Sequence, residues 1–108
     1  MKVNFSDVEL VDLDDNPLPF GDGRTLTFRV AVCHALTSNL PGDEQEDGAA
    51  KHNCYKLALK IKKATTPMDV KVEDLVVIKK RVTKAFAPLV VGAIFDLIEG
   101  VEEPKGEA

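Results

Sequence analysis

Two cysteines and two histidines are the residues of this chain best suited to hold a metal ion. They match the inventory of a small zinc site, but their spacing does not. Cys33 and His34 are adjacent, and His52 precedes Cys54 by two positions. On a helix these separations turn side chains about 100° and about 200° apart. Neither pair would converge on one ion, so we predict no metal site and no cofactor.

Two loop motifs also invite a ligand. The segment that begins at Asp12 resembles the start of a calcium loop, which needs glycine at its sixth position and glutamate at its twelfth. Pro17 and Gly23 occupy those positions. The glycines of segment 21–23 lack the continuation of a phosphate-binding loop. Both motifs therefore predict turns rather than binding sites.

The candidate general bases are His34, His52 and carboxylates in polar loops. No serine or cysteine lies in a recognisable nucleophile motif, and no reaction class follows from these residues. We therefore expect a protein that is not an enzyme.

Apolar spacing predicts four helices that would position these residues. The first follows an N-cap at Thr25 or Thr27 and ends before Pro41, the second covers about 49–64, the third about 73–86, and the fourth begins at Pro88 and ends near Gly100. The predicted buried faces are Phe28, Ala31, Val32, Ala35 and Leu36; Ala50, Cys54, Leu57, Ala58 and Ile61; and Leu75, Ile78, Val82, Ala85 and Phe86.

The first twenty residues predict a small β-hairpin. Residues 3–12 alternate partly between apolar and polar, a turn signal follows at 14–17, and 18–20 could return as an edge strand. Residues 68–72 alternate as well and favour an extended segment. The predicted fold is mainly α (α+β), with an N-terminal β-hairpin followed by a compact four-helix domain over residues 1–100 and a flexible acidic tail over 101–108.

Charge is distributed unevenly along the chain, whose formal net charge is -4. Residues 1–50 contain 3 basic and 10 acidic side chains, whereas residues 51–84 contain 10 basic and 3 acidic ones. If the second and third helices packed side by side, their outward groups would form one basic surface able to bind an acidic protein. Those groups are Lys51, Tyr55, Lys56, Leu59, Lys63, Lys80, Arg81 and Lys84. A solvated lysine face without a function is the alternative, and acidic residues 43–47 could lie against the same surface.

The fourth helix is apolar around about two thirds of its circumference. Such a helix is typical of the centre of a core, wrapped by the others. The alternative is that one flank contacts a second subunit, through Val91, Ile94, Phe95 and Ile98.

The N-terminus lacks the apolar stretch of a secretion signal, and no apolar run approaches the length of a membrane span. We therefore expect a cytoplasmic protein. Segments 25–27, 55–61, 73–82 and 88–92 resemble small proteins encoded by phages and prophages. The resemblance implies a bacterial cytoplasm during phage development, where small helical proteins serve as tail or head assembly factors, chaperones or regulators.

These observations predict a non-enzymatic protein–protein interaction or assembly factor that binds a protein partner and could form a homo-oligomer. The runner-up is a nucleic-acid-associated regulator that uses the same lysines. The net negative charge and the single interleaved aromatic, Tyr55, disfavour it.

Overall fold

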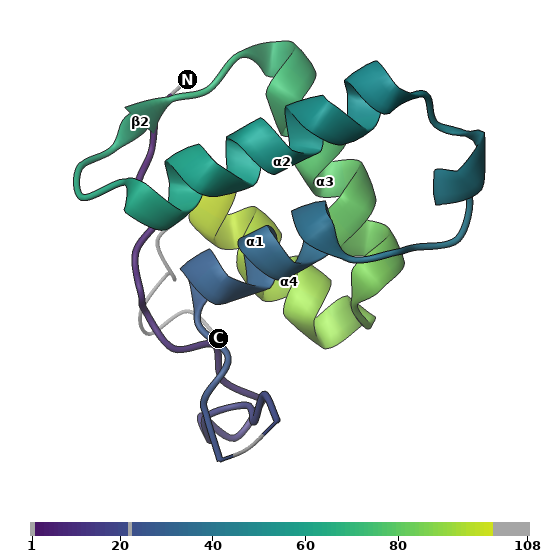
Figure 1. Cartoon of the computed structure of the whole chain (residues 1–108). Coiled ribbons are helices and arrows are strands. Elements are labelled where there is room, and N and C mark those ends of the chain that lie inside the picture. The colour runs from purple at the N-terminus through teal and green to yellow at the C-terminus, as the bar shows by residue number, and fades with distance from the viewer. Residues whose placement is uncertain (1, 22, 101–108) are drawn as a thin grey trace.

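The predicted four helices are present in the computed structural model, which describes residues 2–21 and 23–100 (Figure 1). The helices are α1 (Phe28–Thr37), α2 (Gly48–Lys63), α3 (Val72–Ala85) and α4 (Pro88–Glu99). A short 3-10 turn, η1 (Asp43–Gln45), lies between α1 and α2. The fold is mainly α with a small β component, as the sequence predicted.

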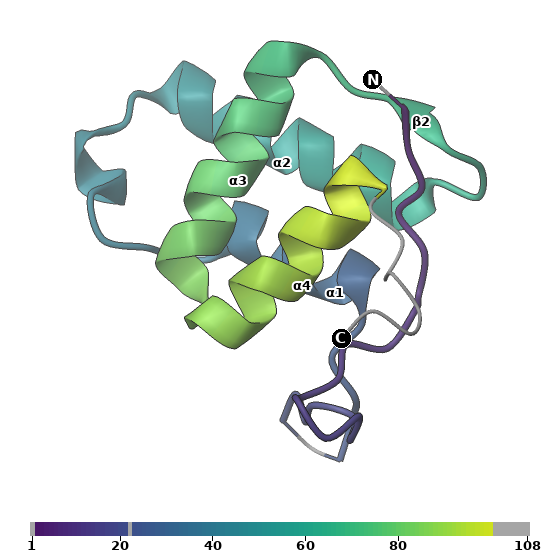
Figure 2. The same cartoon turned by 180° about the vertical axis from the view of Figure 1, so that it is seen from behind.

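Helix α1 lies beside α2 in one layer, with α3 and α4 behind them, and α1 contacts all three of the other helices (Figures 1 and 2). Its apolar face is closed off from solvent: Phe28, Ala31, Val32 and Ala35 have no exposed surface. The prediction that the fourth helix is the central one was wrong. Only Ile94 and Ile98 of α4 are buried, whereas five residues of α1 are.

The start of α1 is fixed by the chain that precedes it. Thr27 accepts a hydrogen bond from the backbone N–H of Val30 at 3.2 Å, as an N-cap does. The N–H groups of Phe28 and Arg29 donate to the carbonyls of Val8 and Ser6, at 2.9 and 3.0 Å. The N-terminal segment therefore satisfies donors that every helix start leaves free.

Residues 8–21 and 23–27 form a triangle of three extended stretches rather than a regular hairpin. Leu18 donates to Leu10, Leu26 donates to Leu18, and Leu10 donates to Leu26, with N···O distances of 3.0, 2.8 and 2.9 Å. The expected turn after residue 12 is present, and Val11 and Pro17 bridge across it. The two prolines lie at its edge, where a missing N–H breaks no ladder.

The regular strands pair across a long interval of sequence. Strand β1 (Lys2–Val3) runs antiparallel to β2 (Met68–Asp69), with Val3 opposite Met68. The extended segment predicted at 68–72 is thus partly a strand, and its partner is the N-terminus. Val3, Phe5 and Val70 are buried beside it, and Phe5 stacks on Phe28 with ring centroids 5.4 Å apart.

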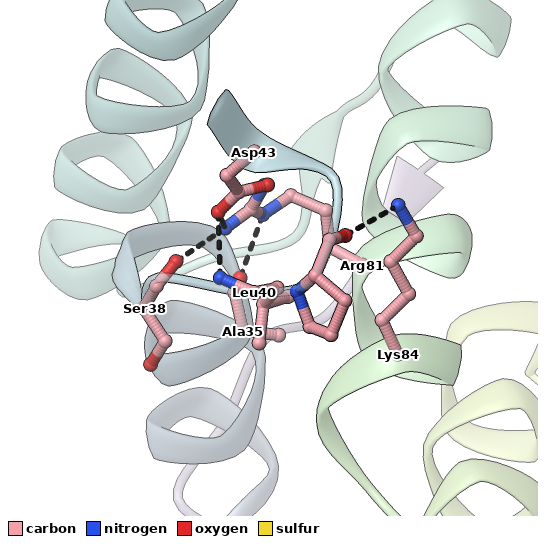
Figure 3. A network of polar contacts seen from close by, with 7 residues as sticks. Ala35, Ser38, Leu40, Asp43, Arg81 and Lys84 are labelled. Atoms are coloured by element: carbon pink, nitrogen blue, oxygen red, sulfur yellow. Dashed lines mark hydrogen bonds and ion pairs between the residues drawn. The ribbon is translucent and has the colours of Figure 1, made fainter. Parts of the chain in front are cut away.

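The loop after α1 is tied to α3 by Arg81 (Figure 3). Its Nε donates to the carbonyl of Ala35 at 2.7 Å, and one Nη donates to that of Ser38 at 2.6 Å. The other Nη donates to Asp43 Oδ1 at 2.9 Å. Asp43 in turn accepts from the N–H of Leu40 at 2.7 Å. Arg81 therefore caps the carbonyl end of α1, where a cation is favoured.

Arg29 does the same for α2. Its Nη1 lies 3.0, 2.8 and 2.7 Å from the carbonyl oxygens of Ile61, Lys62 and Ala64. Its Nε is 3.2 Å from a carboxylate oxygen of Asp7, an ion pair without hydrogen-bond geometry. A residue in the first turn of α1 thus holds the last turn of α2, and fixes how the two helices lie against each other.

Candidate functional site: the groove between α1 and α2

A shallow groove runs along the outer surface where α1 meets α2. Its middle is a hollow of about 250 Å³, to which α1 contributes Cys33 and Thr37. Helix α2 contributes the remaining lining residues, Tyr55, Ala58, Leu59 and Lys62. Cys33 Sγ lies 3.5 Å from the carbonyl oxygen of Ala58, so the floor is closely packed. Tyr55 and Leu59 are 55% and 36% exposed, which is high for an aromatic and a leucine beside a core.

Two further hollows extend this middle part at either end. The first, of about 640 Å³, shares Cys33, Thr37 and Lys62 with it and reaches Phe20 and Val30. The second, of about 320 Å³, shares Thr37 and Tyr55 and reaches Lys51. We call the three together the α1–α2 groove. Its α2 lining runs from Lys51 to Lys62, about three helical turns, which suits a segment of polypeptide better than a compact small molecule.

The groove has a basic edge because α2 carries five lysines and no carboxylate. Lys51 and Lys62 line it directly. The carboxylates at its two ends are Asp7 and Asp43, each of which forms an ion pair with an arginine. The unpaired charge along the edge is therefore positive.

The structure brings together part of the predicted basic surface. Lys51, Tyr55 and Leu59 all line the α1–α2 groove, as their helical spacing suggested. Lys56 and Lys63 are exposed on the same helix but outside the lining. The first half of the predicted set is thus one surface.

The α3 half of the predicted surface meets the groove only through Arg81, which lines the hollow of about 320 Å³. Lys80 and Lys84 line another hollow, between α3 and the start of α2, and do not reach the groove. Arg81 is not a surface group: its side chain is 13% exposed and bound to Asp43. The prediction that it points outward was wrong, because its side chain folds back over the end of α1. The expected contact of acidic residues 43–47 with basic groups is present at Asp43, while the acidic tail 101–108 lies outside the described residues.

The surroundings of Asp43 stabilise its charged form. The hydrogen bond from Arg81, with that from the backbone of Leu40, lowers the pKa of the Asp43 carboxyl below its ordinary value. Lys84 adds a hydrogen bond to the carbonyl of Pro41 at 3.0 Å. These contacts hold the loop that closes one end of the groove.

The predicted oligomer surface on α4 is mostly inside the molecule. Ile94 and Ile98 are 0% and 1% exposed, so they cannot contact a second subunit in this fold. Val91 and Phe95 are half-buried, and Lys79 Nζ lies 5.2 Å from the centroid of the Phe95 ring. The broad apolar face of α4 is explained by contacts with α1, α3 and β1.

The cysteines and histidines do not gather. Among residues 2–21 and 23–100, no three His, Cys, Asp or Glu side chains are arranged to hold a metal ion. Burial raises the pKa of both thiols, Cys33 in the groove floor and Cys54 beneath it. His34 and His52 are exposed and packed against aromatic rings, those of Phe20 and Tyr55 respectively.

Two residues that shape the groove escaped the sequence analysis. Thr37 is common to all three hollows, yet it lies at the polar end of α1, where nothing in its spacing marks it. Arg29 is a cation in the first turn of α1, where the helix dipole disfavours one. Such a misplaced charge is a signal that the side chain has a partner elsewhere.

No model of a known family, no curated protein and no solved structure matched this chain. Within the part of the chain that the structure describes, no helix combines the length and the apolar character that crossing a bilayer demands.

Proposed function

We propose that this chain is a non-enzymatic protein-interaction module whose α1–α2 groove binds an acidic, amphipathic segment of a partner protein. The observation that carries the proposal is the combination of exposed Tyr55 and Leu59 with the lysines of α2. Apolar side chains of the segment would pack on Tyr55 and Leu59. Its carboxylates would lie beside Lys51 and Lys62.

The side chains that line the site favour a polypeptide ligand over nucleic acid. Sequence-tolerant binding of single strands depends on several aromatic rings on which bases stack. Tyr55 is the one tyrosine of the chain, and there is no tryptophan. The groove floor is apolar at Leu59 and Ala58, which suits leucine-like anchors placed one helical turn apart.

Tyr55 makes a direct assay possible, because as the sole tyrosine in a chain without tryptophan it reports on the groove alone. The probe is a synthetic helical peptide with leucines spaced by four residues and glutamates between them. Binding is expected to protect Tyr55 from quenching by acrylamide. Peptide binding should weaken as the salt concentration rises from about 0.01 M to about 1 M, because the Debye length falls from about 30 Å to about 3 Å and the lysines are screened from the carboxylates.

Matched variants decide whether the groove is responsible. Lys62→Glu should reduce affinity for the peptide about tenfold, whereas Lys60→Glu changes the same charge on the same helix outside the groove and should have little effect. Peptides with lysine in place of glutamate, or serine in place of leucine, should not protect Tyr55. Equal protection by all three peptides would refute the proposal.

The nucleic-acid reading is tested with the same reporter. Phosphate binding would give a linear fall of log K with log salt whose slope counts the ions released. If neither DNA nor RNA binds at low salt, that alternative is excluded. The cytoplasmic, phage-related setting and an assembly role remain proposals that rest on the sequence resemblance; neighbouring genes for phage heads or tails would support them.

A further inference from the structure

The most exposed large apolar side chain of the described residues belongs to a rigid turn. Leu13 is 90% exposed and lies at the tip of the turn after residue 12. Asp12 Oδ1 accepts hydrogen bonds from the N–H groups of Asp14 and Asn16, at 2.8 and 2.9 Å. Asp15 adopts the left-handed conformation, with φ of 65°, and its N–H donates to the carbonyl of Asp12. The turn is therefore preorganised, and it presents a leucine that is almost fully exposed.

The surroundings of Leu13 are acidic. Residues 7–15 contain five carboxylates and no basic side chain. Val8, 44% exposed, lies in the same patch, and Asp96 of α4 lines the hollow behind it. We call residues 8–15 the acidic turn. In both views the segment that contains it projects away from the helices (Figures 1 and 2).

The acidic turn has the chemistry that the α1–α2 groove requires of an occupant. It offers apolar side chains flanked by carboxylates, while the groove offers an apolar floor flanked by lysines. The two surfaces share no residue, so both are available on one molecule at the same time. We propose that the acidic turn of one copy docks in the α1–α2 groove of a second copy.

This contact is heterologous, since two different surfaces meet. Each bound copy still presents a free groove or a free turn, so the contact repeats and produces a ring or a filament rather than a closed two-fold dimer. The preorganised turn loses little conformational freedom on docking. The inference rests on the proposed function of the groove. The acidic turn of a second copy would then compete with the acidic segment of the partner protein for the same groove.

The test uses sedimentation velocity over a range of concentrations at low salt. Wild type should show concentration-dependent association that weakens as salt rises. Leu13→Ser removes the apolar anchor and should weaken association about tenfold. Lys62→Glu should do the same from the groove side. Val72→Ser, at a valine that is 71% exposed on α3, and Lys60→Glu are the matched controls and should behave as wild type.

Mixing the variants distinguishes a heterologous contact from any other. An equimolar mixture of Leu13→Ser and Lys62→Glu should form heterodimers, because one keeps an intact groove and the other an intact turn. Species longer than a heterodimer should be absent, because the two surfaces left unoccupied are the turn that carries Leu13→Ser and the groove that carries Lys62→Glu. Thermal unfolding of each variant confirms that it is folded.

Three results would overturn the inference: a wild type that stays monomeric, association that Leu13→Ser leaves unchanged, or two variants that do not complement each other. If one of these results is obtained but the acidic peptide still protects Tyr55 from acrylamide, self-docking is refuted and the proposed function stands. If the peptide also fails to bind, both are refuted.

Discussion

Replacing Arg29 with methionine should destabilise the protein more than any other single change to a charged side chain of α1 or α2. Methionine keeps the apolar stem, so the substitution isolates the guanidinium. Three carbonyl oxygens lie within 3.0 Å of Nη1. That nitrogen has only two hydrogens, so we count two hydrogen bonds.

A hydrogen bond from a charged donor contributes about 1.5–3 kcal/mol net. We take the lower limit for each of the two, because the carbonyl of Lys62 lies at the exposed end of α2 and water can replace the lost donor there. The ion pair with Asp7 adds little, since that carboxylate is 68% exposed. The expected loss is about 3 kcal/mol, or about 12–24 °C in Tm for a chain of this size.

The assay is urea unfolding followed by far-ultraviolet circular dichroism, with Lys60→Met as the control on the same helix. An unchanged m-value would show that the free energy of unfolding changed rather than the compactness of the denatured state. The free energy of unfolding of Arg29→Lys should lie between those of wild type and Arg29→Met, because an ammonium cannot reach all three carbonyls from one position. A loss below about 0.5 kcal/mol for Arg29→Met, the range of ordinary surface substitutions, would refute the cap.

Three further predictions concern the core, the Asp43 pair and the thiols. Phe28→Ala removes a fully buried ring that stacks on Phe5, and calorimetry should show a loss of about 3–5 kcal/mol, or no cooperative transition. The pKa of Asp43 is lowered in the folded state, so its stabilising contribution is present above the unfolded pKa of about 3.9 and is lost as pH falls through the lower folded pKa. Wild-type Tm should therefore fall below about pH 4 more steeply than that of Asp43→Asn, and parallel curves would contradict this. Burial raises the pKa of Cys33 and Cys54, so iodoacetamide should modify both more slowly in the folded protein than in urea, and equal rates would show that neither is protected.

The helices could be predicted from sequence because each signal is local. Thr27, Pro88 and Gly100 mark helix ends through their own backbone chemistry, and Gly100 has the expected left-handed conformation, with φ of 69°. The apolar stripe of α1 is buried as its spacing indicated, and so is that of α2 except for Ala50, which is half-buried. None of these inferences required knowledge of what lies opposite in space.

The groove could be predicted only in part, because it depends on which helices lie next to each other in space. The face of α2 that carries Tyr55 and Leu59 followed from periodicity, but its neighbour did not. The helix beside it is α1, not α3, and so Lys80 and Lys84 of α3 line a different hollow. Arg81 has the spacing of an outward lysine-like residue, yet carbonyls near the end of α1, 46 residues away along the chain, draw it inward. The local pattern around Arg81 gives no sign of this distant partner.

The pairing of β1 with β2 has a consequence for the order in which the protein acquires its structure during translation. The first strand is complete after residue 3, but its partner ends at residue 69. At a synthesis rate of about 5–20 residues per second, the N-terminal segment waits roughly 3–13 seconds for that partner. During this interval Val3 lacks the strand that later pairs with it, so the nascent chain is most prone to capture by a chaperone before α3 leaves the ribosome.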